Sequence, residues 1–262
     1  MSFFLWPAIA TLFLVFLHCL FGSFVLKRGI LFIDLALAQW AAFGYLLAHL
    51  FCLHHPLMQF LMAFLMTVLA AALLSILRCF YQKANEIEAL IGALYLAAST
   101  LSLTVMASSG LEGQHLSELL GGSLLFVQKN DVLITALIYL VIGLTLWRFY
   151  QIFEQGKKGI WDFFFYALFG LAVTSSVKIA GVMLVFAYLI LPILSAQSLL
   201  KTTKSKLIFA WSLGLIASLI GMGLSFIIDI APAYLIILSL LASWLLTLLF
   251  TQNNIIRKNF FI

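Results

Sequence analysis

Charged side chains are scarce in this sequence. Asp, Glu, Lys and Arg together account for 9% of the 262 residues, and hydrophobic residues account for 65%. An ordinary soluble domain has roughly 25% charged residues, so the composition excludes a soluble fold and indicates that lipid is the main solvent. The net charge of +5 does not indicate nucleic-acid binding, because the basic residues lie between apolar segments and do not form a cluster.

Sequence motifs of catalysis are also missing. There is no G-x-x-x-x-G-K-[ST] phosphate loop, and the nearest string, Gly156-Lys157-Lys158-Gly159, lacks the spacing and the hydroxyl that hold magnesium. No G-x-S-x-G elbow and no H-E-x-x-H zinc motif occur. Three cysteines stand singly in apolar sequence, without the C-x-x-C spacing of a metal clip or redox pair: Cys19, Cys52 and Cys79. We therefore expect a protein that is not an enzyme and that binds no cofactor of its own.

Long apolar runs fill most of the chain. A membrane-spanning helix needs roughly 20 apolar residues, and cutting the sequence at charges and turn residues gives nine runs of about that length. We predict an all-α fold, a polytopic membrane helix bundle of about 8–9 transmembrane helices, as a single transmembrane domain over residues 1–262. The weakest candidate is 161–178, because so short a segment also fits a partial crossing. The nine runs are 4–26, 30–51, 57–80, 87–107, 131–148, 161–178, 181–200, 207–228 and 232–251.

The basic residues predict the orientation of these spans. With nine crossings, twelve of the 14 Lys and Arg residues fall on one side of the membrane, and only Lys129 and Lys178 fall on the other. Because Lys and Arg concentrate in cytoplasmic loops, we predict an outer N-terminus and a cytoplasmic C-terminus.

Residues 161–197 place two apolar runs around a short polar kernel, Thr174-Ser175-Ser176-Val177-Lys178. This pattern predicts a hairpin of two helices in lipid, with its turn near Lys178 and Gly181. Pro192 lies inside the second helix and frees a backbone carbonyl, which needs a partner in the protein or in a water-filled path. We predict that this helix lines a path.

Polar residues inside the spans are costly in lipid and are therefore candidates for function. His18 has a neutral imidazole that either ligates a metal or bonds to a neighbouring helix. Asp34 lies within about a turn of the cytoplasmic end, and we expect it to pair with Lys27 or Arg28. Gln39 is a candidate for a transport path, because its amide offers both a donor and an acceptor.

The longest segment between spans runs from 107 to 131 and is expected outside, with a short amphipathic helix. Its polar residues Glu112, His115 and Glu118 share one helical face by their i,i+3 spacing. This face is an ion-attracting outer mouth, a docking surface for a binding protein, or a solvated face.

Three blocks of the sequence resemble one protein family. Residues 28–44 read RGILFIDLALAQWAAFG, residues 86–125 include EIEALIGALYLAAS and HLSELLGGSLL, and residues 162–196 include VKIAGVMLVFAYLILP. They are similar, in this order, to a second-helix signature, an E-A-x-I-G run with an LL-G-x-x-L segment, and a V-G-V-L-L-V-x-A-L-L-I-x-P string. The family is that of the integral membrane permeases of ATP-binding-cassette importers for zinc, manganese and iron.

The resemblance implies both cargo and partners. It implies a permease subunit of a bacterial cytoplasmic (inner) membrane that forms a homodimer around a translocation path for a divalent transition-metal ion. A separate ATP-binding subunit would hydrolyse ATP on the cytoplasmic side, and a solute-binding protein would deliver the cargo outside.

Two regions depart from the family's pattern. Family members that import manganese or zinc usually carry an acidic residue and a histidine four apart in the second helix, and the corresponding positions here are Leu35 and Gln39. We therefore expect Gln39 and His18 to serve as metal-path residues. The loop that docks the ATPase in the family is short here, at 150–159, and Glu154 and Gly156 are its expected coupling residues.

Two other functions stay open at the level of sequence. A secondary transporter or channel would need no ATPase, but it would be expected to show an inverted repeat, and none is visible. A non-transporting membrane scaffold is favoured if the polar residues all face helix neighbours.

Overall fold

The computed structural model describes residues 2–53, 55–81, 83–109, 124–156 and 159–260. Within these ranges the regular structure is entirely helical. It comprises α1 (Ser2–Arg28), α2 (Ile33–Leu50), α3 (Pro56–Leu77), α4 (Ala84–Ser109), the short 3-10 helix η1 (Leu124–Phe126), α6 (Lys129–Arg148), α7 (Tyr150–Glu154), α8 (Ile160–Ala180), α9 (Val182–Leu199), α10 (Thr203–Ile228) and α11 (Pro232–Phe260).

Nine of the described helices are long and apolar enough to cross a membrane. They correspond one to one to the predicted runs, so the all-α membrane bundle is confirmed. The doubtful run at 161–178 is a full helix, α8. The polar kernel at 174–178 lies inside α8 and not in a turn, because the chain reverses only at Gly181, whose φ of 78° is open mainly to glycine.

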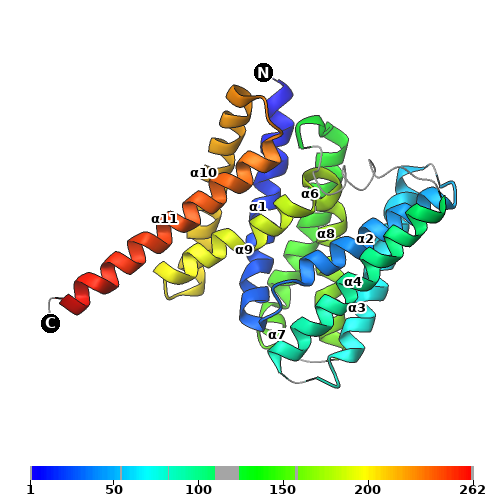
Figure 1. Ribbon diagram of the computed structural model, residues 1–262, viewed down its shortest axis with the longest axis horizontal. Coiled ribbons are helices and arrows are strands. Elements are labelled where there is room, and N and C mark those ends of the chain that lie inside the picture. Colours follow the sequence, from blue (N-terminus) through cyan, green and yellow to red (C-terminus); the bar gives the residue numbers. More distant parts are fainter. Residues whose placement is uncertain (1, 54, 82, 110–123, 157–158, 261–262) are drawn as a thin grey trace.

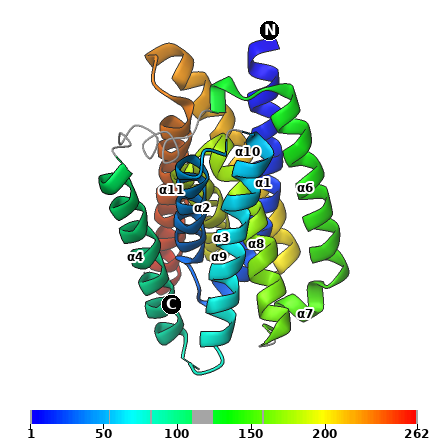
Figure 2. The same cartoon turned by 90° about the vertical axis from the view of Figure 1, so that its right-hand side faces the viewer.

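The helices form a central group flanked by two outer groups. Figure 1 shows α10 and α11 on one side, the α2–α3–α4 group on the other, and α1, α6, α8 and α9 between them. Seen after a quarter turn, α4 and α6 stand on opposite sides of the bundle (Figure 2). In their most apolar stretches, 67% of the residues of α1, α2 and α8 are buried, against 22% for α4 and α11. The core of the protein is therefore built on α1, α2 and α8.

Glycines allow two of the closest helix crossings. A methyl group on Gly22 of α1 would lie 2.0 Å from the Leu189 carbonyl oxygen of α9, and one on Gly44 of α2 would lie 2.5 Å from the Ala63 Cα of α3. Close backbone approach through small residues stabilises helix pairs in lipid, where burial of apolar surface gives little net gain.

Helices α3 and α8 are joined by polar contacts along their length. The Thr67 and Thr174 hydroxyl oxygens lie 3.3 Å apart, and the Thr67 side chain packs against Gly170. Nearer the start of α8, the Ser75 hydroxyl donates to the Gly159 carbonyl, 3.1 Å away. These contacts fix how the two helices are placed relative to each other.

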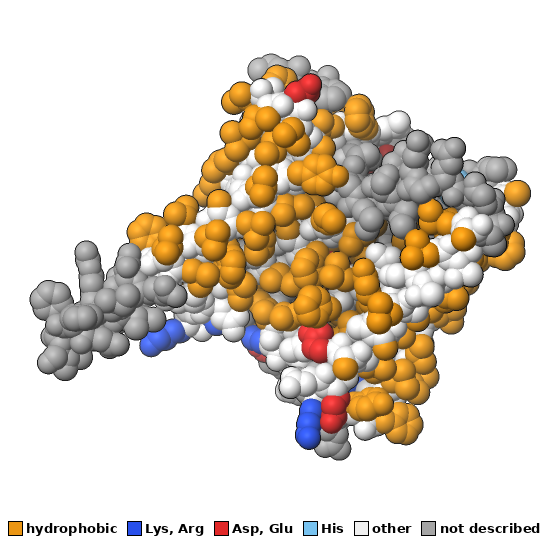
Figure 3. All heavy atoms as spheres, in the orientation of Figure 1, with side chains coloured by type: hydrophobic (Ala, Val, Ile, Leu, Met, Phe, Trp, Pro, Cys, Tyr) orange, Lys and Arg blue, Asp and Glu red, His pale blue; other side chains and the backbone are white. Residues whose placement is uncertain are grey.

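Basic residues gather at one end of the bundle. Arg28 and Arg148 close α1 and α6, and Arg78 follows α3; Lys and Arg side chains line the lower margin of the molecule in Figure 3. We call this end the basic end. At the opposite end Lys178 of α8 lies 3.6 Å from Asp131 of α6. The predicted separation of Lys178 from the other basic groups therefore agrees with the fold.

Candidate functional site

A buried ion cluster occupies the basic end, where α1, α3 and α8 meet. Asp162 opens α8, with one carboxylate oxygen 3.0 Å from Arg28 Nη1 and the other 2.6 Å from Arg78 Nη1. The side chains of Asp162, Arg28 and Arg78 are 1%, 4% and 10% exposed. We call Arg28, Arg78, Asp162 and Tyr166 the Asp162 cluster, because the Tyr166 hydroxyl lies 3.0 Å from Arg78 Nη1. Attraction within this water-excluded site offsets part of the cost of removing the charges from water.

Helix α7 lies directly beside the Asp162 cluster. Arg28 Nη2 donates to the Phe153 carbonyl of α7 over 2.5 Å, and the Phe153 ring is buried against Phe165 and Trp161. The loop that we expected to be short thus contains one ordered helical turn. Its inner face is anchored by an aromatic side chain and by a main-chain hydrogen bond.

The predicted coupling residues lie on and just after α7. Glu154 forms an ion pair with Lys27 of α1 over 2.5 Å, with side-chain exposures of 37% and 42%. The Tyr150 hydroxyl also lies 3.4 Å from Glu154, and burial raises the pKa of Tyr150, so this group stays a protonated donor at neutral pH. Gly156 has a φ of 62° and open space around its Cα. The loop therefore needs glycine at 156 for its backbone conformation.

The predicted pairing of Asp34 with Lys27 or Arg28 is wrong. Lys27 pairs with Glu154 and Arg28 with Asp162. Asp34 follows the 29–32 turn, which reverses the chain and carries α2 away from the basic end (Figure 1). Asp162 lies 134 residues beyond Arg28, so nearness in the sequence could not identify it as the partner of Arg28.

Asp34 is the least compensated polar group in the described core. Its side chain is fully buried, and neither carboxylate oxygen has a hydrogen-bond partner. It interacts electrostatically with Tyr139 of α6, whose side chain is also buried. A buried carboxylate without a counter-charge is costly, so Asp34 marks a strained point in the core.

The start of α2 is held by a residue that was not singled out in the sequence. The Glu88 carboxylate of α4 accepts a hydrogen bond from the backbone N–H of Leu31, just before α2 begins. Glu88 belongs to the E-A-x-I-G-like run, and a carboxylate at a helix N-terminus satisfies free donors and complements the helix dipole. The motif therefore has a structural task, which is to position α2.

His18 lies in the middle of the bundle with both ring nitrogens engaged. Nδ1 is 2.8 Å from the Leu14 carbonyl oxygen of its own helix, and Nε2 is 3.3 Å from the Ser176 hydroxyl of α8. The imidazole is fully buried. Of the two readings of His18, this geometry favours a hydrogen bond to a neighbouring helix over metal ligation.

Gln39 is 8% exposed and lies midway along α2, which packs against α3, α4 and α8. It has no hydrogen-bond partner among the described residues. Across the same described ranges, no three His, Cys, Asp or Glu side chains come together as a metal site. His18 lies on α1 and Gln39 on α2, and within the described ranges His18 belongs to no such cluster.

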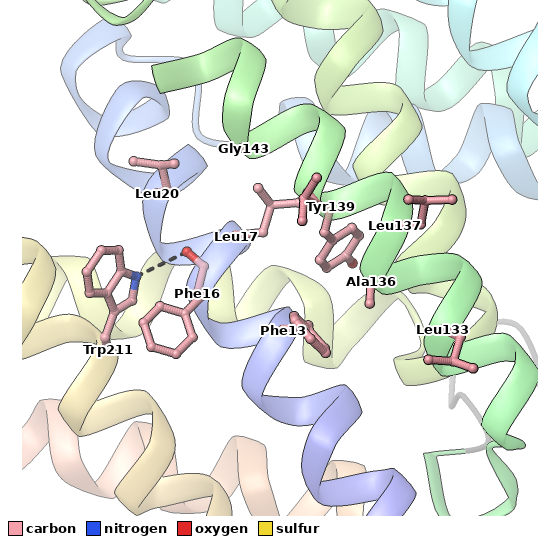
Figure 4. Close-up of a pocket in the computed structure, with 11 residues that line it drawn as sticks. Phe13, Phe16, Leu17, Leu20, Leu133, Ala136, Leu137, Tyr139, Gly143 and Trp211 are labelled. Atoms are coloured by element: carbon pink, nitrogen blue, oxygen red, sulfur yellow. Dashed lines mark hydrogen bonds between the residues drawn. The ribbon is translucent and has the colours of Figure 1, made fainter. Parts of the chain in front are cut away.

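An apolar groove of about 530 Å³ lies between α1, α6 and α10 (Figure 4). At one side the Trp211 indole N–H donates to the Phe16 carbonyl over 3.1 Å. Its α6 wall includes Leu133, Leu137 and Leu140, which are more than half exposed. The lining contains no charged residue, so the groove suits hydrocarbon chains and not a metal ion.

The predicted outer-mouth residues Glu112, His115 and Glu118 lie outside the described residues. That prediction stays a prediction.

Two solved structures share this fold. PsaBC from Streptococcus pneumoniae, in complex with Fab, aligns with a TM-score of 0.76 and 20% identity over 94% of this chain and 91% of that one. A transporter assigned to the metal-chelate ABC type, in an inward-facing conformation, aligns with a TM-score of 0.65 and 22% identity over 88% and 81%. No curated protein sequence matches the chain.

A family comparison covers nearly the whole sequence. The profile of the ABC 3 transport family matches residues 1–155 and 157–251, which include all nine candidate spans. The resemblance noted in the sequence is thereby confirmed. The chain is a membrane-spanning permease that belongs to the ABC 3 transport family.

Proposed function

We propose that this permease imports a divalent transition-metal ion, zinc, manganese or iron, as one half of a homodimer. The observation that carries the proposal is the family match across residues 1–155 and 157–251. It is supported by the three sequence blocks that resemble metal importers and by the fold shared with a metal-chelate type ABC transporter. A separate ATP-binding subunit would supply energy, and a solute-binding protein would deliver the metal.

The basic end is proposed to face the cytoplasm of a bacterium, across its inner membrane. The positive-inside rule supports this orientation, because Lys and Arg concentrate at cytoplasmic ends of spans. The ATP-binding subunit would then meet α7, where Gln151, Glu154 and Gln155 are exposed while Phe153 is buried. A short helix whose inner face is anchored and whose outer face is polar can transmit a movement of the ATP-binding subunit to the helix bundle.

The metal path is proposed to run along α2 past Gln39. A neutral amide binds a transition metal more weakly than imidazole or carboxylate does, so the ion would be held only briefly. His18 would contribute only if its hydrogen bond to Ser176 is exchanged during transport.

An uptake assay tests the cargo and the path. The chain would be expressed with its ATP-binding and solute-binding partners in cells that lack other importers, and uptake of radioactive zinc, manganese and iron would be measured in parallel. We expect uptake of at least one metal to require ATP, and Gln39→Leu to reduce it. Gln197→Leu, at an exposed position of α9, is the matched control.

Three outcomes would contradict the proposal. Uptake without an ATP-binding partner would point to a channel or secondary transporter. No uptake of any metal by a folded complex would favour a scaffold or another cargo. Unchanged uptake in both Gln39→Leu and His18→Ala would remove these residues from the path.

The coupling role of α7 is tested with the purified complex. Glu154→Lys puts two positive charges side by side, and Gly156→Val places a branched side chain at a φ of 62°. Both should reduce transport-stimulated ATP hydrolysis while the protein still folds. Full stimulation in both variants would exclude the loop as the coupler, and the turn at 201–206 would become the next candidate.

A further inference from the structure

The two arginines of the Asp162 cluster carry the same charge but make different second contacts. Arg28 reaches beyond Asp162 to the Phe153 carbonyl of α7, and its guanidinium lies 3.8 Å from the centre of the Phe165 ring. Arg78 reaches instead to the Tyr166 hydroxyl, one turn further along α8. Arg28 thus ties α1 to both α7 and α8, whereas Arg78 ties α3 to α8.

The contact between Arg28 and α7 is shielded from water. Phe153 is 1% exposed, and Phe165 is fully buried beneath the guanidinium. The other tie between α1 and α7, the pair Lys27–Glu154, is exposed on both sides, and exposed ion pairs contribute little and weaken with salt. Arg28 is therefore the stronger polar link from α7 into the bundle.

We propose that Arg28, oriented by Asp162, is a positioning residue that holds α7 rigidly against α1 and α8, so that a displacement of α7 moves both helices. This inference rests on the proposed function, in which the ATP-binding subunit acts on α7. Arg28 touches neither ATP nor cargo. Its planar fork suits the task, because one face of the guanidinium stacks on Phe165 while two of its nitrogens donate to different elements.

The cluster contains its own matched control. Two arginines surround one aspartate. Removal of either arginine therefore leaves one neutral ion pair, and no buried charge is left without a partner. Arg28→Met and Arg78→Met should therefore both fold. They differ in whether α7 keeps its main-chain hydrogen bond.

The experiment uses the complex of this chain with its ATP-binding partner, reconstituted in proteoliposomes and supplied with the solute-binding protein. ATP hydrolysis and uptake of radioactive zinc, manganese and iron are measured together, and the ratio of metal transported to ATP hydrolysed is the readout. For Arg28→Met we expect this ratio to fall about tenfold. For Arg78→Met the melting temperature should fall while the ratio stays at the wild-type value. Arg28→Lys keeps the charge but not the fork, and should give an intermediate ratio.

The result that overturns the inference is an unchanged ratio in Arg28→Met, or an equal fall in Arg28→Met and Arg78→Met. The α7 variants separate this failure from failure of the proposed function. If Glu154→Lys and Gly156→Val lower stimulated hydrolysis while Arg28→Met keeps the ratio, α7 is the coupler and Arg28 does not position it. If the α7 variants also have no effect, the coupling role of α7 itself is wrong.

Discussion

The Cys19 thiol of α1 lies 3.6 Å from the Tyr188 carbonyl oxygen of α9 and donates to it. Tyr188 is four residues before Pro192, which has no N–H to return the usual helical hydrogen bond. The carbonyl freed by Pro192, which we expected to face either a partner or a path, has found a partner on a neighbouring helix. Whether α9 also lines the path stays a prediction.

This relationship predicts a hierarchy among Cys19 variants. Cys19→Ser keeps a donor for the carbonyl and should retain stability, whereas Cys19→Ala leaves it unsatisfied and should cost about 1–3 kcal/mol. Thermal unfolding in detergent measures the difference. In a Pro192→Ala background the helix supplies its own donor, so the additional cost of Cys19→Ala should shrink. An equal cost in both backgrounds would show that the thiol does not serve this carbonyl.

Gly22 should tolerate no side chain. Because a methyl group there would lie 2.0 Å from the Leu189 carbonyl oxygen, Gly22→Ala should separate α1 from α9 and destabilise the protein by about 1–3 kcal/mol. Gly92→Ala in α4 is the matched control, since open space surrounds that Cα, and alanine favours a helix. Similar melting temperatures for the two variants would contradict the close crossing.

The two buried aspartates should respond in opposite ways to amide substitution. Asp162→Asn removes the partner of two arginines and should cost about 3–5 kcal/mol. Asp34→Asn removes a carboxylate that has no partner, so the melting temperature should stay the same or rise. A large loss of stability in Asp34→Asn would mean that the carboxylate has a partner in the assembled transporter.

Native cysteines can report the orientation of α3. Cys52 precedes this helix and Cys79 follows it, and both are exposed. In intact cells, a membrane-impermeant maleimide should label a variant that retains only Cys52 and should spare one that retains only Cys79. Buried Cys19 serves as the unreactive control. Equal labelling of Cys52 and Cys79 would contradict the nine-span topology.

The spans could be predicted from the sequence because hydropathy and length are local properties. The run at 161–178 is an example, since its few polar residues did not interrupt the helix. Helix α7 was less predictable, because it is too short to show periodicity and is held by Arg28 and Phe165 from other helices.

The ion pairs were the least predictable part. Arg28 and Asp162 are far apart in the sequence, and the residues around each give no indication that the two side chains pair. Asp34 was assigned to the nearest basic residues, but the turn before α2 carries it away from them. Local charge patterns predict which side of a membrane a residue faces; they do not predict which helix it meets.

The polar seam between α3 and α8 has contacts at three depths: Thr67 with Thr174, Ser75 with Gly159, and Arg78 with Asp162. One contact would allow two helices to swivel, and two would allow them to hinge about the line joining them. Three contacts spread along the seam suppress sliding, rotation and splaying together. We therefore expect α3 and α8 to move together as one rigid pair, and a rearrangement of the bundle to take place along other helix boundaries, such as the apolar groove between α1, α6 and α10.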